Sequence, residues 1–220
     1  MPFGVPWPTW EQRAPAQRWA PTAVEVHDVH GRAITVVTDG LRGGYQHVCS
    51  PRAVCEVLAQ LPRSDVNGLG LVVLRQAARK EEIFRLAWGR IRWCVDFRGY
   101  SGPAVMVDAI DFTHPRFWLG RSLPPEWQRE VERLRDFGFA VQLTRRGYVL
   151  EVAEPEPVRR WLLARTVPHE VGHWVDFRHW VLDRIGIPDV GEARNHPSYE
   201  SLLDNWDRRP EREPEEFADR

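Results

Sequence analysis

Short apolar runs, in which β-branched residues are frequent, alternate along this chain with longer stretches of helical period. The short runs are typical of strands and the longer stretches of helices. Strands are predicted at residues 33–38, 70–74, 91–97, 104–110, 139–144 and 148–152. Helices are predicted at residues 51–61, 77–88, 124–138 and 157–185, with a short helix near 199–206 and a final helical turn at 213–219. This order of elements favours an α+β fold.

Proline and glycine refine the longest predicted helix, which covers residues 157–185. Gly186 follows this stretch as a stop signal. Pro168 lies inside it and lacks the amide hydrogen that the interior of a helix uses. We therefore expect a break there and a second helix whose first turn begins at Pro168.

Composition excludes several classes of protein. The net charge is −1 and no run of five or more basic residues occurs, so no nucleic-acid partner is expected. No stretch approaches 18 uninterrupted apolar residues, so no membrane span is predicted. The cysteines are odd in number, three, and form no CxxC pattern, which argues against a disulfide framework and a cysteine zinc site. Residues 1–22 lack the apolar segment of a signal peptide, and a cytoplasmic location is expected.

The residues that carry chemistry are His169-Glu170-Val171-Gly172-His173, an HExxH motif inside a predicted helix. Residues four apart lie on one face of a helix, so both imidazoles can reach one zinc ion. Glu170 is rotated by about 100° from His169. It therefore lies beside the metal, where a carboxylate can take a proton from zinc-bound water.

A zinc ion in a catalytic site needs a third protein ligand, and one candidate is local. His179 gives the spacing HExxHxxxxxH, which is that of the metzincins. In metzincins a glycine at this position lets the chain turn back toward the metal, but this chain has Asp176 there instead of glycine. The methionine turn of that family is also absent, because Met1 and Met106 both precede the motif.

The other candidates lie near the end of the sequence. Glu213, Glu215 and Glu216 are acidic, and Glu215 and Asp219 are four residues apart on the last predicted helical turn. A pair at this spacing can supply one carboxylate to the metal and another to the outer nitrogen of a zinc-bound histidine. The residue types alone leave the choice among these glutamates and His179 open.

The segments HEVGHWVDF and EEFAD together resemble the catalytic domains of the anthrax lethal factor and Pro-Pro endopeptidase group. The resemblance covers about residues 160–220 and implies a zincin-like metallopeptidase fold, with a small mixed sheet, an active-site helix and a late ligand helix. It also implies one zinc ion per chain, with Glu215 as the third ligand. Asp219 is then the acid that hydrogen-bonds the outer nitrogen of a zinc-bound histidine. Gly172 and Asp176 match the zinc helix of that group.

The chain departs from the family pattern at the oxyanion donor. The family carries tyrosine seven residues before the ligand glutamate, and that position is Arg208 here. Arg208 is one candidate electrophile, and Tyr199 and His196 are two others. Asp176 is expected either to hydrogen-bond His173 or a neighbouring arginine, or to lie on the surface.

Two portions of the chain are expected, which are compatible with one continuous domain. Residues 1–120 form an N-terminal α/β portion with a substrate-binding or regulatory role, in which residues 1–22 are an irregular arm rich in proline and tryptophan. Residues 121–220 carry the zinc site. The expected substrate edge is the strand at residues 148–152.

The function predicted from these patterns is hydrolysis of peptide bonds in a peptide or protein substrate by a zinc-activated water, with Glu170 as general base. One alternative is a metzincin-like peptidase that uses His179. A second is a zincin-fold protein that binds or regulates without catalysis, and a third is an interaction module in which the motif is accidental. The sequence does not indicate an oligomeric state.

Overall fold

The protein is described by a computed structural model, which covers residues 19–77, 88–122, 125–210 and 212–219. Its class is α+β, as the sequence predicted. Five strands form the main sheet in the order β1-β2-β4-β6-β5. Their bounds are β1 Pro21–Val29, β2 Arg32–Asp39, β4 Leu71–Arg75, β5 Gly89–Phe97 and β6 Tyr100–Asp108. β2, β4 and β6 are parallel, and the edge strands β1 and β5 are antiparallel to their neighbours.

Four strands of this sheet confirm those predicted at residues 33–38, 70–74, 91–97 and 104–110, with shifted ends. The edge strand β1 was not predicted. Its residues Val24 and Val26 are exposed and Val29 at its end is buried, so its apolar residues do not mark a continuous buried face. The helix predicted at residues 77–88 falls almost wholly on residues 78–87, outside the described residues.

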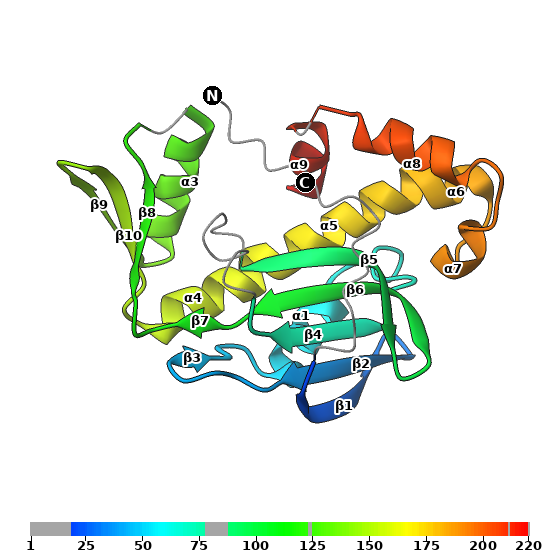
Figure 1. Ribbon diagram of the computed structural model, residues 1–220, viewed down its shortest axis with the longest axis horizontal. Coiled ribbons are helices and arrows are strands. Elements are labelled where there is room, and N and C mark those ends of the chain that lie inside the picture. The colour runs from blue at the N-terminus through cyan, green and yellow to red at the C-terminus, as the bar shows by residue number, and fades with distance from the viewer. Residues whose placement is uncertain (1–18, 78–87, 123–124, 211, 220) are drawn as a thin grey trace.

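A second sheet has three strands, β8 Arg116–Gly120, β10 Gly147–Glu151 and β9 Ala140–Thr144, with β10 in the middle. The hairpin predicted between residues 139–144 and 148–152 is confirmed. Because β8 and β9 occupy both edges of β10, the prediction that a substrate pairs with residues 148–152 is wrong. Two short strands, β3 Tyr45–Gln46 and β7 Ile110–Asp111, pair separately. Figure 1 shows the three-stranded sheet and α3 (Pro125–Asp136) at the end of the molecule opposite α7 (Val190–Ala193).

One long helix crosses a face of the main sheet (Figure 1). It comprises α4 Pro155–Trp161, a π-helical turn η2 Leu162–Thr166, α5 Val167–Phe177, a second π-helical turn η3 Arg178–Leu182, and α6 Asp183–Ile185. Gly186, at φ +78°, ends it as expected. The remaining helices are α1 Pro51–Gln60, α8 Tyr199–Asp207 and α9 Arg212–Ala218, and Ser50 caps α1.

The break expected at Pro168 is wrong, because the helix continues through it. In η2 the amide of Val167 donates to the carbonyl of Leu162. This wider turn falls where the proline ring would otherwise collide with the carbonyl four residues earlier. The π-helical turn thus lets Pro168 stand in the first turn of α5 without interrupting the helix.

The main hydrophobic core lies between the sheet and the helices α1 and α5. It includes Val36 and Leu58 from the first half of the chain and Trp174, Phe177 and Leu203 from the second half. The two expected portions therefore share one core. This packing fixes α5 against β5 and β6, and so fixes the helix that carries the HExxH motif.

Candidate metal centre

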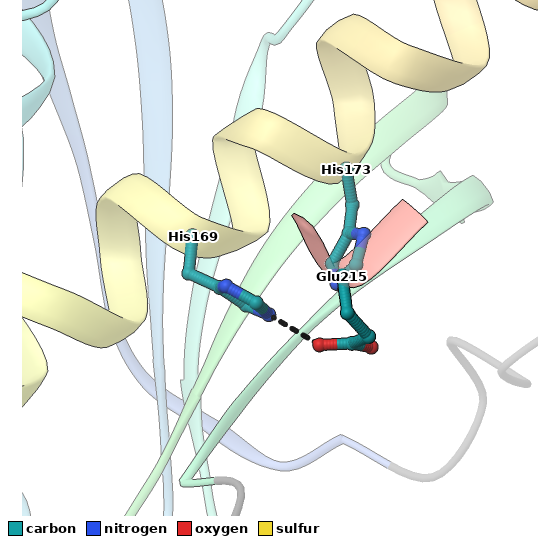
Figure 2. A group of neighbouring side chains, drawn as sticks. All are labelled: His169, His173 and Glu215. Atoms are coloured by element: carbon teal, nitrogen blue, oxygen red, sulfur yellow. Dashed lines mark ion pairs between the residues drawn. The ribbon is translucent and has the colours of Figure 1, made fainter. Parts of the chain in front are cut away.

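His169 and His173 lie one turn apart on α5, and their imidazoles face the same space. Their ring centroids are 4.5 Å apart with planes at 82°. Glu215, on α9, approaches from the other side, and Figure 2 shows both rings pointing toward its carboxylate. One ligand atom from each of the three residues lies within 4.8 Å of the others. Among the described residues, this is the group of side chains that can hold a metal ion.

The distances place the Glu215 carboxylate between the two rings. Its Oε2 is 3.3 Å from Nε2 of His169, and its Oε1 is 3.6 Å from Nε2 of His173. Two imidazole nitrogens and one carboxylate oxygen are a ligand set that suits Zn²⁺, with a further position left for water. The donor set therefore fits a zinc ion held by three protein ligands.

Asp219 orients His169 from behind. Its carboxylate accepts a 2.9 Å hydrogen bond from Nδ1 of His169 and pairs with Arg165 at 2.6 Å and Arg133 at 3.7 Å. With Nδ1 occupied as a donor, Nε2 of His169 is the nitrogen that faces Glu215. This is the carboxylate–histidine arrangement that fixes the tautomer of a metal ligand. Arg165 stands four residues before His169 in the sequence. That spacing could have indicated its pairing with Asp219, but the pairing was not predicted.

Glu170 is buried beside this group, with 7% of its surface exposed. Its Oε2 accepts a 2.7 Å hydrogen bond from the backbone amide of Ile91 in β5. Burial raises the pKa of the Glu170 carboxyl to about 7, against the opposing effects of His169 and the Ile91 amide. A carboxylate with such a pKa can both accept and return a proton near neutral pH. The contact with Ile91 was not foreseeable from the sequence, because it joins a strand to a distant helix.

The two histidines differ in charge. Burial lowers the pKa of His169, but Glu215, Glu170 and Asp219 outweigh it and raise that pKa to about 9. Burial and the neighbouring His169 lower the pKa of His173 to about 4. The pKa of Glu215 is lowered despite its burial, chiefly by its hydrogen bond to His169. The metal-free site thus holds a charged His169, a neutral His173 and an ionised Glu215 at neutral pH.

Asp176 is buried and contacts the C-terminal part of the chain. It accepts a 2.8 Å hydrogen bond from the indole of Trp206 and pairs with both terminal nitrogens of Arg209, one of them at 3.1 Å. Of the expectations for Asp176, that of a neighbouring arginine is met. A surface role is wrong, because only 1% of the residue is exposed.

The other candidate ligands lie outside the metal group. His179 is exposed, with its Nε2 3.9 Å from Asp183 and its ring against Phe217. α5 runs on into η3 without the turn that would bring His179 back. Glu213 and Glu216 are exposed on α9, and neither joins the group of His169, His173 and Glu215.

The three expected oxyanion donors each have a partner of their own. Arg208, at the end of α8, is exposed and lies 3.8 Å from Asp204. Tyr199 is buried at the start of α8, where Arg194 hydrogen-bonds its phenol. Nδ1 of His196 accepts a hydrogen bond from the Ser198 amide.

Comparisons with known proteins do not identify the chain. No protein-family model matches it, and no curated protein or solved structure matches it either. Within the described residues, no helix has both the length and the apolar composition needed to cross a bilayer. The function is therefore inferred from the geometry of the site.

Proposed function

We propose that this protein is a zinc-dependent metallopeptidase that hydrolyses peptide bonds. The observation that carries the proposal is the convergence of His169, His173 and Glu215 from two helices, with the buried Glu170 beside them. A bound zinc ion would polarise a substrate carbonyl and lower the pKa of its water. His169, His173 and Glu215 would hold that ion.

Glu170 supplies the acid–base chemistry. Its pKa of about 7 suits a general base that takes a proton from water and then passes it to the leaving amine. The Ile91 amide holds one carboxylate oxygen, so the side chain keeps one orientation while it gains and loses the proton. Asp219 keeps the His169 ring in place in the same way.

The substrate would lie along β5 instead of the strand expected from the sequence. β5 is an edge strand of the main sheet, paired only with β6 among the described strands. Its Ile91 amide points away from β6 to Glu170, so this edge faces the candidate site. An extended peptide can add to such an edge through backbone hydrogen bonds.

Metal analysis of purified variants tests the ligand set. We expect about one zinc per chain in the native protein, and loss of zinc in both His169→Ala and Glu215→Ala. His179→Ala is the matched control, because its ring lies outside the metal group. Zinc that survives Glu215→Ala but is lost in His179→Ala would show that the metzincin-like alternative is correct.

A second candidate function is metal binding without catalysis. It is favoured because two of the expected oxyanion donors have other partners. Arg208 lies beside Asp204, and Arg194 hydrogen-bonds Tyr199. Digestion of a quenched fluorescent peptide library by the zinc-loaded protein separates the two functions. Cleavage that disappears in Glu170→Gln supports the peptidase, and zinc binding with no cleavage supports the second candidate.

A further inference from the structure

α5 and α9 meet at Gly172, between the two histidines of the ligand set. A Cβ atom built on Gly172 would lie 2.6 Å from Cα, 2.8 Å from the oxygen and 3.1 Å from the carbonyl carbon of Ala218. These are backbone atoms, so a side chain at Gly172 would have to displace α9 itself. Ala218 precedes Asp219 and lies one turn from Glu215, so such a displacement moves both carboxylates.

A second contact lies one turn further along the same helix face. Asp176 is buried and binds Trp206 in α8 and Arg209 just after α8. The guanidinium of Arg209 also lies over the Trp180 ring, 4.5 Å from its centroid. The end of α8 is therefore attached to the long helix shortly before the chain enters α9.

α9 has seven residues, a length at which an isolated helix is not stable in water. Its position must come from packing, and α5 is the helix it packs against (Figure 1). Gly172 determines how closely α9 approaches, and Asp176 determines where the segment before it is held.

We propose that Gly172 and Asp176 are positioning residues, which dock the C-terminal segment on α5 so that Glu215 and Asp219 reach the two imidazoles. This inference rests on the proposed function only for the identity of the metal. The docking itself is a property of the protein without metal, and it is tested separately.

Hydrogen exchange of the metal-free full-length protein measures the docking. In Gly172→Ala we expect amide exchange across residues 212–218 to rise by at least about tenfold, with β4 and β6 unchanged, because α9 displaced from α5 opens locally at a lower free energy. Asp176→Asn should raise exchange in the same segment and at the end of α8. Gly191→Ala is the matched control, since its Cβ would meet only the Asp189 side chain, at 3.1 Å.

Zinc affinity, measured by competition with a chelator, provides a readout that a general loss of stability would not reproduce. We expect Gly172→Ala to weaken zinc binding by at least about tenfold, which is the size of effect typical for loss of a residue that supports a metal ligand. Because the effect passes through Glu215 and Asp219, Gly172→Ala should change the residual zinc affinity by less than about twofold in a background that already carries both Glu215→Ala and Asp219→Ala.

The outcomes separate this proposal from the peptidase assignment. Wild-type exchange rates across residues 212–218 in Gly172→Ala would overturn the docking role, as would an equal loss of zinc affinity with and without the carboxylates of Glu215 and Asp219. If the native protein binds no zinc, the proposed function fails, and the exchange experiment still decides the docking. If Asp176→Asn does not fold, Gly172→Ala decides alone.

Discussion

The backbone amide of Ile91 donates a 2.7 Å hydrogen bond to the side chain of Glu170. This bond joins the edge strand β5 to the helix that carries the HExxH motif. A carboxylate this deeply buried is stabilised by hydrogen bonds to its charged form, while burial itself favours the neutral form. Burial outweighs both the charge of His169 and the Ile91 hydrogen bond, and the pKa of Glu170 is raised to about 7.

Glu170→Gln should abolish most peptide hydrolysis while leaving zinc bound. Glutamine keeps an oxygen that can accept from the Ile91 amide, but it cannot take a proton from water. Loss of a general base typically costs about 10²–10⁴-fold in rate. The measurement is cleavage of the peptide library by variant and native proteins of equal zinc content. Glu216→Gln, which changes an exposed carboxyl outside the metal group, is the control. Full activity in Glu170→Gln would exclude Glu170 as the base.

Removal of the acid behind His169 should weaken zinc binding without removing a ligand. In Asp219→Ala the Nδ1 hydrogen of His169 and the guanidinium of Arg165 both lose their acceptor. Such changes typically reduce metal affinity by about 10–100-fold. Asp219→Asn keeps a neutral acceptor and should fall between alanine and the native residue. Chelator competition measures all three proteins, and equal affinities among them would show that Asp219 does not support the site.

The parts of the site that the sequence predicted are those set by local spacing. Residues four apart share a helix face whatever the fold, so the pairing of His169 with His173 follows from the sequence alone. The choice of Glu215 over Glu213 and Glu216 depends on how α9 lies against Gly172, which is a long-range contact. The resemblance indicated Glu215, but the spacing alone could not.

Two of the expectations that are wrong have different physical causes, one long-range and one local. The order of strands in a sheet is not local, so nothing in residues 148–152 shows that β8 and β9 cover both edges of β10. Pro168 was expected to break the helix because the rule for proline assumes α-helical hydrogen bonds. The π-helical turn at residues 162–166 changes those bonds, and the helix continues.

Zinc affinity should depend on pH through His169. The metal-free protein holds a proton on this ring, because the pKa of His169 is raised to about 9, and zinc must displace that proton. The apparent affinity should therefore rise with pH by about tenfold per unit between pH 7 and 9, and level off above that. His173 contributes no such dependence in this range, since its pKa is lowered to about 4. Competition titrations at several pH values measure the slope, and a flat profile below pH 9 would show that His169 is already neutral without metal.

Zinc should also raise the thermal stability of the protein, because its ligands come from separate segments that only the folded chain brings together. A ligand at about 100 times its Kd stabilises the native state by about 2.7 kcal/mol. For a chain of this size that corresponds to a Tm increase of about 5–10 °C. Differential scanning calorimetry with zinc and with a chelator measures the difference. Glu215→Ala should lose most of the zinc-dependent shift, whereas His179→Ala should keep it. A shift that is equal in both variants would place the stabilising metal somewhere other than at His169, His173 and Glu215.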